Sequence, residues 1–150
     1  MNIGGQKYVV RELAKLAKID VSNSRYRRFS GKHDTFITQR FNRTNVGDRI
    51  HFASALTLLG KRDGDSADTG VSYLDIAEFI IKNSARTNHD LEQLWRRILF
   101  NVCVSNVDDH LRNHGFLLED KGWILLSTYD LNPSPTGNGL SPNISKEDNS

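Results

Sequence analysis

The chain has 150 residues, 37% of them hydrophobic and 25% charged, which excludes a chain disordered throughout and suits one domain with its own core. Against 18 acidic residues there are 20 basic ones, and the net charge of +2 is too small to favour direct binding to nucleic acid or to a membrane surface. No N-terminal apolar run resembles a signal peptide, and no stretch has the length of a membrane span. The single cysteine, Cys103, lies in an apolar helical pattern, so we expect a buried thiol and a cytoplasmic protein.

The first part of the chain predicts a helix followed by a hairpin. Residues 1–18 are amphipathic, and one face carries the apolar residues Val9, Leu13, Leu16 and Ala17. Segments 25–29 and 35–41 predict two strands that are joined by a turn at residues 30–34.

The middle of the chain predicts two further helices separated by a loop. Residues 50–59 look helical and end at Gly60, and the charged stretch 61–70 predicts a surface loop. A clearer helix then begins after Ser72, a candidate N-terminal cap. Its apolar positions follow the helical repeat and are Tyr73, Ile76, Ala77, Ile80 and Ile81.

The next helix leads directly into a polar loop. Its apolar positions are Leu91, Leu94, Trp95, Ile98, Leu99 and Val102. We expect Trp95 in the core, and Arg96 and Arg97 on the solvated face. Segments 114–118 and 123–126 then predict a strand pair that turns through residues 119–122.

From Asn132 onward the composition becomes polar and rich in Asn, Ser, Pro and Gly, which predicts a loose tail. The order of elements predicts a mostly helical α+β fold with small antiparallel hairpins, arranged like the C-terminal lobe of a protein kinase.

The spacing of three polar residues indicates phosphoryl-transfer chemistry. Asn113 follows Asp108 by five positions, and Asp130 comes one hairpin later. Protein kinases use an Asp and an Asn at this spacing to accept the proton of the attacking hydroxyl and to hold magnesium. A later Asp holds magnesium on the nucleotide phosphates.

Two other interpretations of these residues remain open. Asp108, Asp109 and Asn113 are also common in helix caps and turns, and for Asp109 a loop or capping role is the simpler one. His114 has no expected role. A metal-dependent phosphohydrolase is a further alternative, with its ligands drawn from Asp108, Asp109, His110 and His114.

Three separated segments resemble one family. They are residues 39–43 (QRFNR), residues 49–52 and 54–60 (RIHF and SALTLLG), and residues 100–116 together with 129–133 (YDLNP). In this order they resemble the C-terminal part of HipA-like serine/threonine kinases, the toxin component of bacterial toxin–antitoxin modules. The resemblance covers residues 8–147 and implies a C-terminal kinase domain over residues 1–131, without its N-terminal lobe. Residues 132–150 would be the tail of that domain.

The resemblance implies a catalytic and metal-binding set. Asp108 would be the catalytic aspartate beside the substrate hydroxyl, Asn113 and Asp130 would bind magnesium, and His110 would support the catalytic loop.

It also implies a nucleotide-binding set and several partners. Gln39 and Phe41 would lie beside the adenine of ATP, and Asn42 near the ribose, although Phe41 also fits a core position. Members of the family transfer phosphate from ATP to a protein serine and associate with a DNA-binding antitoxin.

The chain departs from the family pattern in several places. It has no Gly-rich phosphate loop and no strand lysine for the nucleotide phosphates. Gln39 and Asn42 replace acidic residues, and Lys7 stands where the family often has an acidic residue. We therefore expect a fragment, a split gene product or a decayed copy. Two functions follow: a kinase lobe, active or inactive on its own, and a non-catalytic module that binds an antitoxin or a separately encoded N-terminal lobe.

Overall fold

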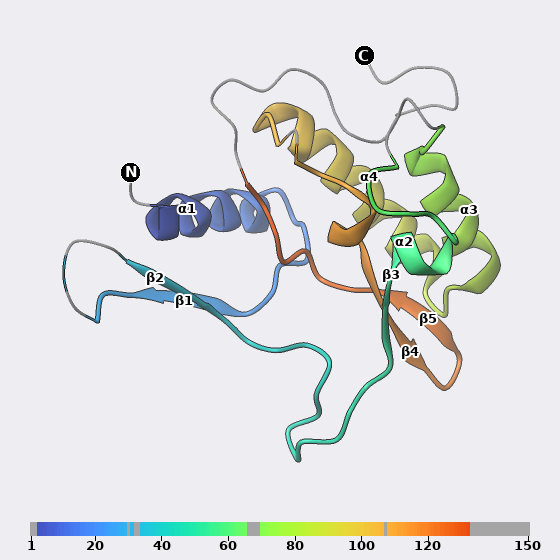
Figure 1. Ribbon diagram of the computed structural model, residues 1–150, viewed down its shortest axis with the longest axis horizontal. Coiled ribbons are helices and arrows are strands. Elements are labelled where there is room, and N and C mark those ends of the chain that lie inside the picture. Colours follow the sequence, from blue (N-terminus) through green and yellow to red (C-terminus); the bar gives the residue numbers. More distant parts are fainter. Residues whose placement is uncertain (1–2, 30, 32–33, 66–69, 107, 133–150) are drawn as a thin grey trace.

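The structure is a computed structural model that describes residues 3–29, 31, 34–65, 70–106 and 108–132 (Figure 1). The helices of this part are α1 (Ile3–Leu16), α2 (Ala55–Leu58), α3 (Tyr73–Asn83), α4 (Thr87–Cys103) and the 3-10 helix η2 (Leu111–Asn113). Its strands are β1 (Ser24–Arg27), β2 (Thr35–Thr38), β3 (Phe52–Ser54), β4 (Gly115–Glu119) and β5 (Gly122–Leu125). The predicted α+β class with small antiparallel sheets is confirmed. The predicted tail beyond residue 132 and parts of the predicted turn and loop (30, 32–33 and 66–69) lie outside the described residues.

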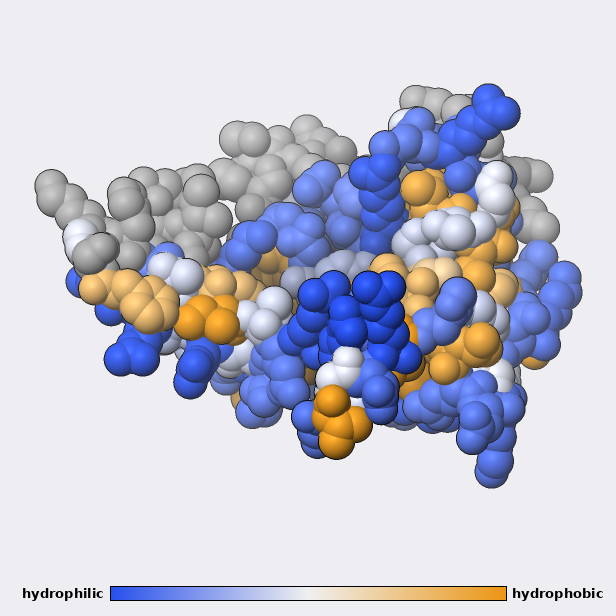
Figure 2. Space-filling model, turned by 60° about the horizontal axis from the view of Figure 1, so that its bottom comes forward, coloured by the Kyte–Doolittle hydropathy of each residue, from blue (hydrophilic) through white to orange (hydrophobic). Residues whose placement is uncertain are grey.

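The strands form two antiparallel sheets at opposite ends of the molecule. β1 pairs with β2, with Tyr26 opposite Phe36, and this hairpin lies beside α1 at one end (Figure 1). β4 is the middle strand of the other sheet, between β3 and β5, and lies near α3 and α4. Residues 44–49 of the loop before β3 are exposed, and in Figure 2 a strongly hydrophilic surface separates the apolar surfaces of these two ends.

Two apolar clusters hold these elements together. The larger one joins the short helix α2, α3, α4, η2 and the three-stranded sheet, and its buried members are Ala55, Val71, Tyr73, Ile76, Ile80, Leu94, Ile98, Leu111, Phe116 and Leu125. The smaller one packs α1 against α4 and against the segment after β5, through Val10, Ala14, Ile19, Phe100 and Leu131. α4 belongs to both clusters, so it fixes α1 relative to the rest of the fold.

The buried face of α1 differs from the predicted one. Val10 and Ala14 are buried, whereas Val9, Leu13 and Leu16 are exposed. Both sets follow helical spacing, and the buried set belongs to the smaller apolar cluster with Phe100 and Leu131.

The predicted helix at residues 50–59 is wrong in its first half. Phe52 and Ala53 pair with Leu117 and Phe116 of β4, so this stretch is strand β3. The helix begins only after Ser54, whose hydroxyl caps it by accepting the N–H of Thr57 at 3.4 Å. Pairing with a strand far along the chain overrides the local helical pattern.

The helices α3 and α4 form where the pattern predicts them. Ser72 caps α3 as expected, in a reciprocal capping box with Asp75. The burial of α4 is different, because Trp95, Leu99 and Val102 are exposed, and so is Cys103, which was expected to be buried.

The buried face of α4 carries a polar stripe between its apolar residues. Its members recur every three or four positions and are Asp90, Gln93, Arg97 and Asn101. The prediction of a solvated Arg97 is therefore wrong. In the part of the chain that the structure describes, no helix is long and apolar enough to cross a membrane.

Asp90, which has no exposed surface, ties the start of α4 to the three-stranded sheet. Its carboxylate accepts the hydroxyl of Ser84 at 2.7 Å and the N–H of Leu125 at 2.9 Å. Arg86 adds an ion pair at 3.3 Å. A buried charge is tolerated when it is paired and hydrogen-bonded in this way.

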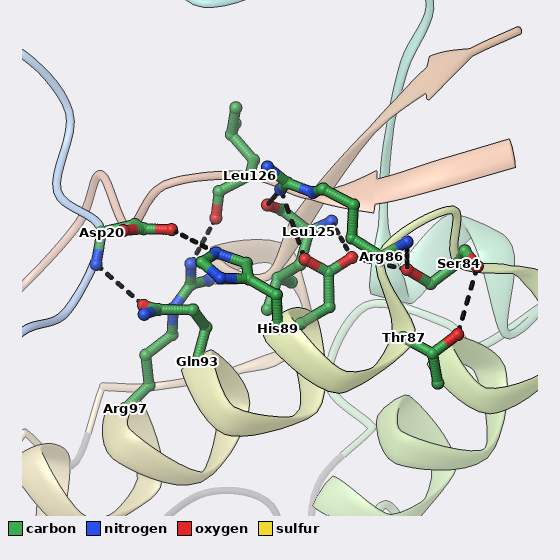
Figure 3. A network of polar contacts seen from close by, with 10 residues as sticks. Asp20, Ser84, Arg86, Thr87, His89, Gln93, Arg97, Leu125 and Leu126 are labelled. Carbon is green, nitrogen blue, oxygen red and sulfur yellow. Dashed lines mark hydrogen bonds and ion pairs between the residues drawn. The ribbon is translucent and has the colours of Figure 1, made fainter. Parts of the chain in front are cut away.

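Two further members of the polar stripe, Gln93 and Arg97, bind the chain after α1 and the chain after β5 (Figure 3). The side-chain amide of Gln93 accepts the N–H of Asp20 at 2.8 Å and donates to the carbonyl of Lys18 at 3.1 Å. His89 contacts the Asp20 carboxylate at 2.8 Å, and Arg97 donates to the carbonyl of Leu126.

We predict that Asp90→Ala lowers the free energy of unfolding by about 3 kcal/mol, because it leaves buried partners without their acceptor. Urea unfolding measures this loss. Glu92→Ala on the same helix is the matched control, since Glu92 is exposed and its ion pair with Arg96 lies on the surface. Equal unfolding midpoints for the two variants would contradict this role of Asp90.

Candidate active site

The loop that carries Asp108 starts where α4 ends in a sharp turn. Ser105 adopts a left-handed backbone conformation with φ of 52°. The next residue, Asn106, is buried and binds Asn101 of the last helical turn twice, through its backbone N–H at 2.9 Å and its side-chain amide at 3.1 Å. These bonds fix the direction in which the chain leaves the helix.

Asn113 closes the loop on itself. Its side-chain nitrogen Nδ2 donates to the backbone carbonyl of Asp108 at 3.0 Å, and its backbone N–H donates to the carbonyl of His110 at 2.8 Å. Asn113 is buried, whereas the Asp108 side chain is exposed. The donation through Nδ2 also fixes the orientation of the amide, so Oδ1 is the atom that remains to accept a cation or a donor.

Asp109 points the other way, into the core. Its Oδ2 accepts the hydroxyl of Tyr73 at 2.5 Å and lies 3.0 Å from Nε2 of His114. Burial alone would raise the pKa of Asp109. The charge and hydrogen bond of His114, the hydrogen bond of Tyr73 and the charge of Arg97 outweigh burial, so this pKa lies below its usual value. Burial likewise raises the pKa of the Tyr73 hydroxyl, which stays protonated as a donor.

The same contacts decide two expectations about this loop. Asp109 is a loop residue as expected, but its carboxylate is engaged by Tyr73 at the start of α3 and by His114 just before β4 and does not cap a helix. His114, for which no role was expected, is one of the buried residues that hold it. The phosphohydrolase alternative loses support, because Asp109 and His114 bind each other. No group of three or more His, Cys, Asp or Glu side chains able to hold a metal occurs among the described residues.

Tyr129 joins this loop to the segment that carries Asp130. Its hydroxyl donates to the carbonyl of Arg112, and its ring stacks on that of Phe41 with centroids 5.3 Å apart. Burial raises the pKa of the Tyr129 hydroxyl to about 12. A Cβ added at Gly115 would lie 3.3 Å from the Tyr129 ring and 2.5 Å from that of Phe52, so glycine permits this close approach.

Asp130 itself already carries two donors. Its Oδ1 lies 3.2 Å from the ammonium of Lys7 on α1 and accepts the side-chain amide of Asn132 at 3.1 Å. Both contacts use the same oxygen, which leaves Oδ2 for another ligand. The side chains of Lys7 and Asp130 are both about one third exposed, at 35% and 36%.

The candidate nucleotide residues follow β2. The N–H of Gln39 is bound to the carbonyl of Asn23 at 2.8 Å, and the Gln39 side chain is exposed. Phe41 lies between Tyr129 and Phe52, whose ring centroid is 5.1 Å away. The carbonyl of Asn42 accepts the N–H of Ile50 at 3.1 Å, and its Oδ1 accepts Arg40 at 2.7 Å, so its Nδ2 is the group that can still donate.

The structure thus brings several candidates into neighbouring positions. Tyr129 contacts both Phe41 and Arg112. Asp130 follows Tyr129 in the sequence, and Asn113 follows Arg112. His110 takes part through its carbonyl, while its Nδ1 is buried without a hydrogen-bond partner in the described part of the chain. Its side chain also lines a surface cleft beside Leu111 and Arg112, so a purely supporting role stays a prediction.

The oxygen atoms of Asn113 and Asp130 suit magnesium. A hard cation that keeps several water molecules and binds phosphates needs only one or two protein carboxylates. One carboxylate and one amide oxygen, carried by segments that Tyr129 holds together, meet this requirement. Cysteine or histidine ligands would instead favour zinc.

The chain belongs to the HipA-like C-terminal domain family, whose family model matches residues 3–150. Over 141 residues it is 28% identical to the "Putative kinase Y4mE" of Sinorhizobium fredii, covering 90% of this chain and 33% of that protein. The fold also matches a chain in the solved complex of the Shewanella oneidensis toxin–antitoxin system HipA, HipB and its operator DNA, with a TM-score of 0.77 and 22% identity. That match covers 95% of this chain and 38% of the other, so the chain spans about a third of the length of these relatives.

The lowered pKa of Asp109 predicts acid sensitivity of the fold. A depressed carboxyl pKa adds stability above the ordinary value of 3.8, and this stability is lost as the pH falls through the folded-state pKa. Asp109→Asn should be less stable than the parent chain at pH 7 and should lose less on further acidification. Unfolding midpoints between pH 7 and pH 2 test this, because most of the loss lies below the ordinary value of 3.8.

Asp108→Asn is the matched control for this measurement. The neighbouring carboxylate is exposed, so the control should follow the acid dependence of the parent chain. If Asp109→Asn instead kept the full acid dependence of the parent chain, another group would have to be its source.

Proposed function

We propose that this chain is the C-terminal lobe of a HipA-like serine/threonine kinase that binds Mg–ATP and directs its terminal phosphate to a protein hydroxyl. The observation that carries this proposal is the closed loop in which Asn113 binds the Asp108 carbonyl, joined through Tyr129 to Asp130. Membership of the HipA-like family and the spacing of the three residues support it.

In this proposal the exposed carboxylate of Asp108 accepts the proton of the substrate hydroxyl. A general base has to lie within hydrogen-bond reach of the proton it takes, and an exposed side chain on a fixed loop can meet an incoming protein segment. The buried Asp109 holds that loop through His114 and Tyr73, so Asp108 is presented in one position.

Asn113 Oδ1 and Asp130 Oδ2 would hold the metal. A magnesium ion bound there neutralises charge on the nucleotide phosphates during transfer. The chain's own contribution is orientation, since the Asn113 amide is fixed by Asp108 and Asp130 follows Tyr129, whose half-buried ring stacks on Phe41.

The base and ribose of the nucleotide would lie along the segment after β2. Phe41, half-buried and stacked on Tyr129, offers an aromatic ring to the base, and Asn42 offers its side-chain Nδ2 as a donor for a ribose hydroxyl. The Gln39 N–H already donates to the carbonyl of Asn23. In this proposal Gln39 therefore contacts the base through its backbone carbonyl or its side-chain amide.

A second candidate is a non-catalytic module that binds an antitoxin or a separate N-terminal lobe. Exposed apolar side chains on α1 and α4, among them Leu16 and Trp95, favour a partner surface. The Shewanella protein with the same fold was solved in a complex that contains HipB and operator DNA. An antitoxin would then contact the DNA, in keeping with the small net charge of this chain.

Calorimetric titration with Mg–ATP separates these two functions. We expect Asp130→Ala to weaken binding by about tenfold or more, a loss of at least about 1.4 kcal/mol, because a charged metal ligand is removed. Asp108→Asn should bind as the parent chain does, since its role lies in proton transfer.

Binding that survives Asp130→Ala unchanged would show that the metal role is wrong. A well-folded parent chain that binds no Mg–ATP would favour the non-catalytic module.

A further inference from the structure

The Asp130 carboxylate, proposed above as a metal ligand, already contacts the positively charged side chain of Lys7. The ammonium of Lys7 is 3.2 Å from Oδ1 of Asp130. The two residues are 123 positions apart in the sequence, so the contact depends on how α1 is placed in the fold.

The packing of α1 determines this placement. Val10 and Ala14 follow Lys7 by three and seven positions, so all three lie along one face of the helix. Val10 and Ala14 pack in the cluster that contains Leu131, the residue after Asp130. In Figure 1 the segment after β5 accordingly runs beside α1. The same apolar contacts that hold α1 therefore bring Lys7 to Asp130.

Lys7 can leave this position more easily than the neighbouring cation can. Lys7 and Arg11 both line a cleft with Ser22, Thr128 and Tyr129. Arg11 is held by the carbonyl of Ser22 and the carboxylate of Glu12. Lys7 ends in a flexible ammonium that is about one third exposed, and a pair of this kind is weak enough to exchange.

We propose that Lys7 is a built-in counter-ion of this site, an inference that rests on the proposed function. Without nucleotide, its ammonium holds the Asp130 carboxylate and opposes the binding of a free divalent cation. With nucleotide, it contacts the phosphate oxygens and supplies positive charge to them. Lys7 therefore lowers the affinity for a free divalent cation and raises the affinity for nucleotide. An ion pair with only a structural role would not change the two affinities in opposite directions.

Two binding titrations of the full chain test this sign reversal. Lys7→Gln should bind Mn²⁺ roughly three- to tenfold more tightly than the parent chain, because a weak, partly exposed ion pair no longer opposes the ion. The loss of the electron paramagnetic resonance signal of free Mn²⁺ measures this affinity. Calorimetric titration with ATP in the presence of EDTA should show that Lys7→Gln binds ATP more weakly than the parent chain, by a similar factor.

Lys15→Gln is the matched control, because it removes the same charge from the same helix. Lys15 is exposed and lies eight residues further on, about 12 Å along the helix and beyond the Debye length at physiological salt. An unchanged affinity of Lys7→Gln in either titration, or equal shifts in Lys15→Gln, would overturn the inference.

Asp130→Ala distinguishes this failure from a failure of the proposed function. If Asp130→Ala abolishes Mn²⁺ binding while Lys7→Gln leaves it unchanged, Lys7 is no counter-ion but the metal site stands. If Mn²⁺ binding survives Asp130→Ala, the assigned metal site is wrong, and the role of Lys7 is wrong with it.

Discussion

Opposite charges are buried together behind the Asp108 loop, and this burial decides how the surrounding elements pack. Asp109 is only 3% exposed and is held by Tyr73 and His114, with the charge of Arg97 nearby. Removing one partner of such a group leaves a buried charge without compensation, which is costly. Elements far apart in the sequence therefore meet at the Asp109 carboxylate. Because Asp109 is held in place, the neighbouring side chain of Asp108 is exposed at a fixed position.

Arg97 connects this constraint to the second polar network. Burial lowers the pKa of its guanidinium to about 10, while the charges of Asp109, Asp20 and Asp90 oppose that shift. Its Nη2 donates to Leu126, whereas Nε and Nη1 have no hydrogen-bond partner in the described part of the chain. Long-range attraction to several carboxylates thus keeps one buried cation charged, and it links α4 to the chain before β1 and after β5.

The sequence predicted what local patterns determine and missed what distant contacts determine. The two long central helices, the Ser72 cap and the last hairpin follow from spacing and capping residues, and the family assignment follows from three motifs. Strand β3 was missed because only its pairing with β4 makes it a strand. Arg97 was expected in solvent because it lies opposite the apolar positions of the helix, although its spacing with Asp90 and Asn101 was a usable signal. The contacts of Tyr129 and Lys7 depend on tertiary packing that no local pattern encodes.

In the proposed function, the loop of Asn113 and the segment of Asp130 converge on one metal site. Paramagnetic broadening by Mn²⁺ in amide NMR spectra of the labelled chain tests it most directly, because broadening reports distance from the ion at each residue. We expect the signals of Asn113, Asp130 and Lys7 to broaden first, whereas that of Gly122 at the start of β5 stays sharp. Broadening centred on another region, or of Asn113 and Asp130 at clearly different Mn²⁺ concentrations, would contradict a shared site.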